Sequence, residues 1–256
     1  IASSMLLLSY AAEIINPAKF CPITIFGIMY LPILILTIIL FVFAIIRRSS
    51  LTSWLVVLLI PSIFLAGRYI RLGWGDKPEE GPVKVVTYNV GLFANGSKSS
   101  KLDSRKALAD AAAKYLMSLD ADVICLQEFY MDNGIGIDEY LESHFPGYRA
   151  DYYLLTGNKG HAGNVTLSRF PVRDKGKVGF EKSTNMALFT DVEVNDSISL
   201  RIYNCHFESY NLSPDEVIKS IMDEEEVEST GRKMRQAIKR RPDQIKAVRS
   251  SMAESP

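Results

Sequence analysis

Three polar residues, each placed where an apolar run ends, are the positions in this chain best suited to chemistry. Asn89, Glu128 and His206 each follow a mostly apolar segment with the composition of a buried strand. Such a strand carries its terminal polar group to the rim of a sheet, where the ligand sites of layered α/β proteins form. The three residues are therefore candidates for one site.

The chemistry that these residue types favour is that of phosphate esters. A carboxylate in the position of Glu128 is costly unless it binds a cation or a hydrogen-bond donor, and Mg²⁺ accepts one or two carboxylates together with waters and phosphate oxygens. Asn89 can orient a ligand or donate to a phosphate oxygen, and His206 can donate to a phosphoryl oxygen or assist a leaving group. Each has an alternative: Asn89 as a turn residue, Glu128 in an ion pair beside a helix, and His206 as a satisfied core histidine.

The elements that must position these residues form a mixed sheet system, and we predict an α+β fold. Period and composition predict a helix over residues 102–119. Strands are predicted over residues 83–90, 122–127, 148–155, 163–168, 186–194 and 198–206. The chain is predicted to be helical from residue 213, where Ser213 and Glu216 form a capping box, with a last helix starting at Pro242.

Charge patterning in the tail has two interpretations. Residues 223–228 are acidic and residues 232–241 are basic. This distribution suits the two ends of helices, and we prefer it to a nucleic-acid patch because the acidic neighbours cancel the long-range field. The three cysteines are interpreted as small apolar core residues rather than as a disulfide framework.

Residues 1–74 are predicted to be a transmembrane region of about three apolar helices, the first of them incomplete. Residues 22–46 carry no charge and are long enough to cross a hydrocarbon core of roughly 30 Å. Residues 51–66 form a second uncharged run, and Glu13 is the one charged residue among residues 1–15. The alternative is a buried hairpin of core helices. Residues 75–82, rich in Gly, Pro and charge, are predicted to be a linker.

Basic residues give the membrane orientation. Arg47 and Arg48 lie between two apolar runs and place that turn in the cytoplasm by the positive-inside rule. The soluble domain is then expected on the outer face, although Arg68, Arg71 and Lys77 favour the opposite orientation.

Four segments resemble the endonuclease/exonuclease/phosphatase superfamily, which includes deoxyribonuclease I, AP endonucleases and neutral sphingomyelinases. They are residues 88–90, Leu126-Gln127-Glu128, residues 167–171 and residues 204–207. The likeness covers residues 83–256, interpreted as the N-terminal portion of such a domain. It implies a four-layer α/β sandwich, incomplete in this chain, and hydrolysis of a phosphodiester or phosphomonoester by metal-activated water, with Mg²⁺ or Mn²⁺ as cofactor.

The resemblance also implies residue roles. Glu128 would be the metal ligand, Asn89 would organise the metal and the phosphate, and His206 would contact the scissile phosphate. His161 falls near the place of an active-site tyrosine in AP endonucleases, so its assignment to substrate binding rests on position alone. The expected partners are a phosphoester substrate (nucleic acid, lipid head group or soluble phosphoester) and a lipid bilayer, with no protein partner implied.

Two segments of the family pattern do not occur in this chain. These are a Gly-Asp-Phe-Asn segment and a Ser-Asp-His segment, and the histidines of the chain are His144, His161 and His206. We therefore expect a fragment of a membrane-anchored hydrolase, with little activity on its own. The alternative is a membrane-tethered binding or structural module with a degenerate site.

Overall fold

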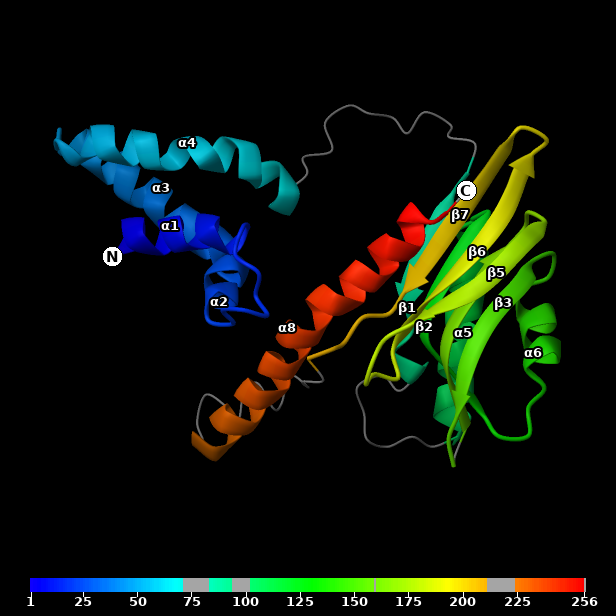
Figure 1. Ribbon diagram of the computed structural model, residues 1–256. Helices are drawn as coiled ribbons and strands as arrows, with labels where there is room; N and C mark the ends of the chain where they lie inside the picture. The colour runs from blue at the N-terminus through cyan, green and yellow to red at the C-terminus, as the bar shows by residue number, and fades with distance from the viewer. Residues whose placement is uncertain (71–82, 94–101, 159, 211–223, 256) are drawn as a thin grey trace. The chain divides into compact units, whose positions relative to one another are not determined.

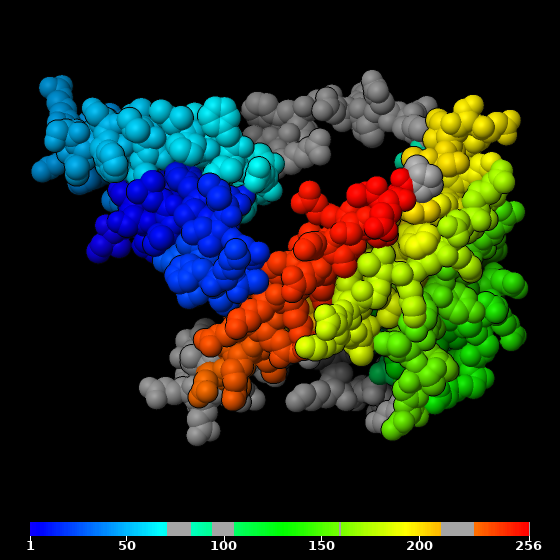
Figure 2. All heavy atoms as spheres, in the orientation of Figure 1, coloured from blue at the N-terminus to red at the C-terminus, as the bar shows by residue number. Residues whose placement is uncertain are grey.

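The computed structural model describes residues 1–70, 83–93, 102–158, 160–210 and 224–255, with the side chains of residues 102–104 and 224–227 left out. The chain divides into two units, residues 1–79 with 210–243 and residues 80–209 with 244–256. Figure 1 labels the helices and strands, and Figure 2 shows the same view with all heavy atoms as spheres. Each unit is described by itself. The predicted linker at residues 75–82 and the capping box at residue 213 lie outside the described residues.

The N-terminal helices of the first unit are α1 (Ala2–Ala12), α2 (Ile23–Ile28), α3 (Tyr30–Ile46) and α4 (Leu51–Tyr69). The uncharged run over residues 22–46, predicted as one span, is divided at Met29, whose φ of −85° and ψ of 8° interrupt the helix. Within the described residues, α4 is the one helix whose length and composition suffice to cross a membrane, a test that buried core helices and signal sequences also pass.

Apolar side chains lie on both the inner and the outer faces of these helices. Leu6, Tyr30 and Leu58 are buried together in one cluster. On the outer faces of α3 and α4, by contrast, Phe43 and Phe64 are 59% and 79% exposed. Large apolar side chains therefore lie on the exposed as well as the buried faces of these helices.

The second unit contains two sheets. The first has the order β1-β2-β4-β3, with β1 (Val85–Asn89) parallel to β2 (Val123–Asp132), and with β4 (Gly160–Ser168) antiparallel to both β2 and β3 (Arg149–Thr156). The second is antiparallel, in the order β5 (Val172–Gly179), β6 (Met186–Asn195), β7 (Ile198–Cys205). The predicted mixed α+β arrangement is confirmed.

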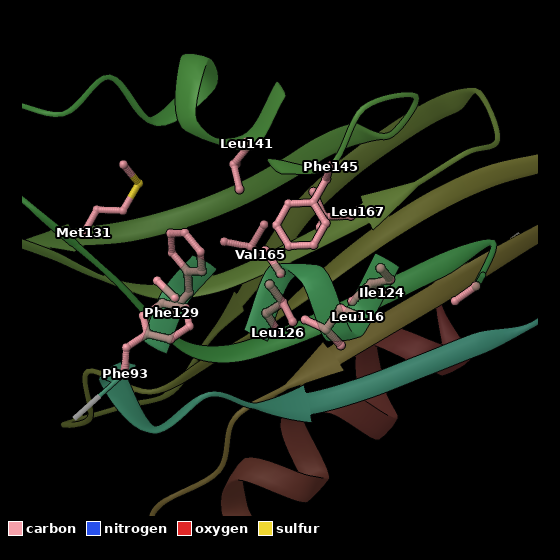
Figure 3. Packing of buried hydrophobic residues seen from close by; sticks show 13 residues of the cluster. Phe93, Leu116, Ile124, Leu126, Phe129, Met131, Leu141, Phe145, Val165 and Leu167 are labelled. Atoms are coloured by element: carbon pink, nitrogen blue, oxygen red, sulfur yellow. The ribbon is translucent and has the colours of Figure 1, made fainter. Parts of the chain in front are cut away.

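Helices α5 (Leu102–Ser118) and α6 (Ile137–His144) cover one face of the first sheet. Figure 3 shows the core between them, where Leu116 of α5 and Leu141 of α6 meet strand residues such as Phe129 and Leu167. Alternation along β4 sends Val165 and Leu167 into this core, so Asn164 and Thr166 face the second sheet.

The last part of α8 (Glu224–Ala253) packs on the outer face of the second sheet. Val248 shares a small cluster with Phe180 and Ala187, and Tyr203 is hydrogen-bonded to Ser251. The unit therefore has four layers, helix, sheet, sheet and helix, as the family resemblance implied. One prediction was wrong, since α8 passes through Pro242 rather than starting there; the proline removes one N–H from the helical ladder without ending the helix.

Candidate active site

Asn89 is held at the end of β1 by the turn that follows it. Its Oδ1 accepts a hydrogen bond from the backbone N–H of Gly91 at 2.9 Å, and Gly91 has a φ of +56° that suits a residue without a side chain. This turn leaves the Asn89 Nδ2 free to point sideways toward the neighbouring strand, where it donates to Oε1 of Glu128 at 2.9 Å.

Glu128 lies at a β-bulge in β2. Leu126 pairs with Val165 of β4, but the next pair is Phe129 with Gly163, so β2 contains one extra residue at this point. Glu128 itself has a φ of +52°, a conformation that costs a non-glycine residue of order 1–3 kcal/mol. The bulge interrupts the alternation of the strand, and both Gln127 and Glu128 find their partners away from the helix-covered face.

His206 follows the last residue of β7 and comes from the second sheet. Its backbone N–H donates to the carbonyl oxygen of Met186 at 3.0 Å, which continues the pairing of β7 with β6. Its ring Nε2 lies 3.2 Å from Oε1 of Glu128. The structure thus brings Asn89, Glu128 and His206 together around one carboxylate oxygen, and the Glu128 side chain remains 29% exposed.

The electrostatics of the cluster keep Glu128 ionised. The hydrogen bond from His206 lowers the pKa of the Glu128 carboxyl below its ordinary value of 4.5, burial opposes this shift, and the hydrogen bond from Asn89 adds to it. Because a carboxylate can only accept hydrogen bonds, Asn89 Nδ2 and His206 Nε2 both act as donors to Oε1.

His161, the fourth residue named from the sequence, has different surroundings. It is paired with Met131 across β2 and β4, and its Nδ1 lies 3.1 Å from Oγ1 of Thr156. It lines a cavity of about 310 Å³ with six other residues: Met131, Ile135, Ile137, Tyr152, Tyr153 and Leu154. Its ring therefore contacts Thr156, which is not a member of the Asn89–Glu128–His206 cluster.

The sequence model of the endonuclease/exonuclease/phosphatase family matches residues 86–221, more than half of the chain. The chain belongs to this family. The match spans all three residues of the cluster. A second model, for a domain of unknown function (DUF8431), matches residues 1–69.

Solved structures similar to this member of the endonuclease/exonuclease/phosphatase family include ANGEL2, a 2′,3′-cyclic phosphatase, with 23% identity and a TM-score of 0.38, over 50% of this chain and 41% of that one. Truncated Caenorhabditis elegans TDP2 has 20% identity and a TM-score of 0.38, over 57% and 55%. A family protein from Beutenbergia cavernae has 17% identity and a TM-score of 0.38, over 55% and 42%. The chain thus spans about half the length of these structures. No curated protein sequence matches it.

The donor set around Glu128 fits a hard cation that keeps most of its water. Among the described residues of this family member, no group of three or more His, Cys, Asp or Glu side chains could hold a metal. Oε1 of Glu128 makes both contacts of the carboxylate with Asn89 and His206, and Oε2 has no partner within the described ranges. Mg²⁺ is commonly bound by one or two carboxylates, waters and substrate phosphate oxygens, which this arrangement allows.

Sequence reasoning gave no role to the buried polar residues behind the cluster. Gln127, Asn164, Thr166 and Asn204 lie between the two sheets and are hydrogen-bonded. A signal for them was present, since each is a polar residue inside a segment predicted as a strand. Pairing between strands decides which of these residues meet, and that information is not local.

Proposed function

We propose that this chain is part of a membrane-anchored phosphoester hydrolase that uses a divalent cation, with Mg²⁺ preferred and Mn²⁺ as a substitute. The observation that carries the proposal is the Glu128 carboxylate, ionised and partly exposed at the bulge in β2, with Asn89 and His206 donating to one of its oxygens. Family membership supports the same reaction class.

Each residue of the cluster has a distinct part in this proposal. Glu128 holds the cation through its carboxylate, and the cation, when bound, neutralises phosphate charge and activates water. Asn89 fixes the orientation of the carboxylate through Nδ2. His206 presents its Nε2 proton to Glu128 Oε1 in the free chain and would turn this proton to a phosphoryl oxygen when a substrate is bound.

The N-terminal helices support attachment to a membrane. Helix α4 is long and apolar enough to cross one, and the outer faces of α3 and α4 expose large apolar side chains such as Phe43 and Phe64. Exposed apolar surface of this extent is unfavourable in water and favourable in lipid. We propose that this region holds the hydrolase at the bilayer, with the second unit on the outer face.

The test is a hydrolysis assay on the complete gene product in detergent or nanodiscs, beside residues 1–256 alone. The substrates are plasmid DNA, sphingomyelin vesicles, inositol phosphates and an RNA ending in a 2′,3′-cyclic phosphate, each with Mg²⁺, Mn²⁺ or EDTA. We expect turnover of one class by the complete product, its loss in EDTA, and a loss of about 100-fold or more in Glu128→Gln.

Glu139→Gln is the matched control, because Glu139 is an exposed carboxylate on α6 and the substitution makes the same charge change. It should leave turnover unchanged. Activity that survives both EDTA and Glu128→Gln would refute the proposed role of the cluster. A complete product that binds phosphoesters without hydrolysing any of them would favour the alternative of a membrane-tethered binding module.

A further inference from the structure

The space between the two sheets of the second unit contains a group of buried polar side chains directly behind the Asn89–Glu128–His206 cluster. Gln127 and Thr166 come from the first sheet, and Asn204 comes from the second; Asn164 of the first sheet completes the group. The side chains of Asn164 and Asn204 are both only 1% exposed. We call these four residues the cross-sheet network.

Asn204 crosses from β7 to the bulge in β2. Its Nδ2 donates to the carbonyl oxygens of Leu126 at 3.2 Å and Val165 at 2.9 Å, and it lies 3.2 Å from Oγ1 of Thr166. Leu126 and Val165 form the last regular pair before the bulge. Because a bulge disrupts the ladder locally, Asn204 supplies a donor at the place where the first sheet needs one.

The acceptor atom of the same side chain reaches the residue next to Glu128. Oδ1 of Asn204 accepts from Nε2 of Gln127 at 2.7 Å. Gln127 directly precedes Glu128, and Asn204 lies two residues before His206, on the same face of its strand. This hydrogen bond therefore joins the two chain segments that carry Glu128 and His206.

Asn164 makes the reciprocal crossing, from the first sheet to the second. Its Nδ2 donates to the carbonyl oxygens of Asn204 and Met186, each at 3.2 Å. The Met186 carbonyl also accepts the backbone N–H of His206. Asn204 thus holds the backbone at the bulge that carries Glu128, and Asn164 holds the backbone beside His206.

We propose that Asn204 is a positioning residue, whose two-sided hydrogen bonding sets the 3.2 Å contact between Glu128 and His206. This inference rests on the proposed function of that cluster. A side chain that only filled space between the sheets would not need three hydrogen bonds. Asn204 bonds to the carbonyl oxygens of Leu126 and Val165 and to the amide of Gln127. Buried amides left without partners are costly, so every bond of Asn204 restricts its geometry.

The chain offers a matched control for general stability. Oγ1 of Thr190 in β6 donates to Oδ2 of Asp151 in β3 at 2.7 Å, and both residues are buried. This hydrogen bond also joins the two sheets, and although Asp151 is the strand partner of Thr166 in the β3–β4 ladder, neither side chain is hydrogen-bonded to a side chain of the cross-sheet network among the described residues. Thr190→Val and Asn204→Leu each replace a buried polar side chain by an apolar one of similar size.

The experiment measures the ring signals of His206 by NMR at one fixed pH in the full chain labelled at histidine. The chain has three histidines, so His206→Gln assigns the signal, and Glu128→Gln gives its position when the contact with a carboxylate is lost. We expect Asn204→Leu to move the His206 signal most of the way to its position in Glu128→Gln, and Thr190→Val to leave it in place. In the active complete protein, kcat should fall by about 100-fold in Asn204→Leu, as for a misplacement of roughly 1 Å.

Gln127→Met provides a second variant if Asn204→Leu does not fold, because it removes the bond to Oδ1 and retains both donors of Asn204; it also removes the contacts of Gln127 with Thr87, for which Thr87→Val is the control. A folded variant whose His206 signal stays at the wild-type position overturns the proposal, and so does an equal movement in Thr190→Val. The NMR result does not depend on turnover. A moved signal with unchanged kcat would therefore support the positioning of His206 by Asn204 while refuting the proposed function of the cluster.

Discussion

Nε2 of His206 lies 3.2 Å from Oε1 of Glu128, although Glu128 belongs to β2 of the first sheet and His206 follows β7 of the second. The two residues are 78 positions apart in the sequence. Their contact therefore depends on the bulge in β2, on the end of β7 and on the distance between the sheets.

The pH dependence of stability should report the ionised state of Glu128. Its pKa is lower in the folded chain than the ordinary 4.5, so its carboxylate stabilises the fold above that pH, and this contribution is lost as the pH falls through the folded pKa. Urea unfolding should be measured from about pH 6 to pH 3. The free energy of unfolding should fall more steeply with decreasing pH in the wild type than in Glu128→Gln. Equal slopes in the two proteins would contradict the prediction; Glu139→Gln corrects for the general effect of removing a surface charge.

Asn89→Asp should make the stability of the fold depend on a divalent cation. The substitution places a second carboxylate about where Nδ2 now lies 2.9 Å from Glu128 Oε1, and repulsion should lower the free energy of unfolding at neutral pH by about 1–3 kcal/mol. Mg²⁺ or Mn²⁺ should restore part of this loss, because hard dications take carboxylate ligands. Thermal unfolding with and without the metal measures it. Asn89→Ala removes the donor without adding charge and should show no comparable recovery; the same metal response in both variants would argue against repulsion as the cause.

The two histidines named from the sequence should differ in their effect on turnover. His206→Gln removes the group beside Glu128 and should lower kcat of the complete protein by about 10²–10⁴-fold. His161→Gln removes a side chain that is hydrogen-bonded to Thr156, and we expect kcat to change by no more than about tenfold. Steady-state kinetics on the substrate found in the panel assay compare them. A larger loss in His161→Gln than in His206→Gln would place the reaction near the His161 cavity instead.

Gly163→Ala should destabilise the second unit strongly. A Cβ atom at this position would lie 2.1 Å from the carbonyl oxygen of Tyr153 and 3.1 Å from Cα of Leu154, and neither backbone atom can move without breaking the pairing of β3 with β4. We expect a loss of about 3 kcal/mol or more in urea unfolding. Gly179→Ala in β5 is the control, since no atom lies within 4 Å of its added Cβ; it should gain about 0.5 kcal/mol. A similar loss in the free energy of unfolding in both variants would show that the backbone around residue 163 moves to make room for the added Cβ.

Cys125 should be inert toward thiol reagents in the folded chain. Burial raises the pKa of its thiol to about 12, the neighbouring Cys205 adds to this shift, and burial also raises the pKa of Cys205. In a Cys21→Ser background we expect thiol titration at about pH 8 to detect neither cysteine until the chain is unfolded. Lys114→Cys on the exposed side of α5 is the positive control. Rapid labelling of Cys125 in the folded protein would disprove its burial.

The sequence was sufficient for the bounds of two strands that contain apolar runs, although β1, predicted as a buried strand, has mostly exposed side chains. Val85–Asn89 and Met186–Asn195 match the predicted strands to within two residues. Strand β5 was missed because its sequence, from Val172 to Gly179, is mostly polar and has no apolar alternation. Helix α6 was missed because eight residues after a glycine-rich segment are too few to display a helical period.

The candidate site was predictable in its residues and not in its geometry. Asn89, Glu128 and His206 could be named because each follows an apolar run, and they do meet. The predicted end of the second strand at residue 127 was wrong, since β2 continues through Glu128 to Asp132. The bulge at Glu128 arises from the register between β2 and β4, which no local pattern encodes. His161 was named by position along the chain, and the pairing of β4 with β2 places it opposite Met131.

Asn164 and Asn204 each hydrogen-bond from one sheet to the other. The Asn89–Glu128–His206 cluster can therefore form only when the two sheets are packed together. Each sheet can form its own hydrogen-bonded ladder, yet neither alone contains both Glu128 and His206. A compact state that retained both sheets but loosened the packing between them would keep its far-UV signal and lose the cluster. Any activity of this protein should therefore disappear with the loosening of the interior, before the strands themselves unfold.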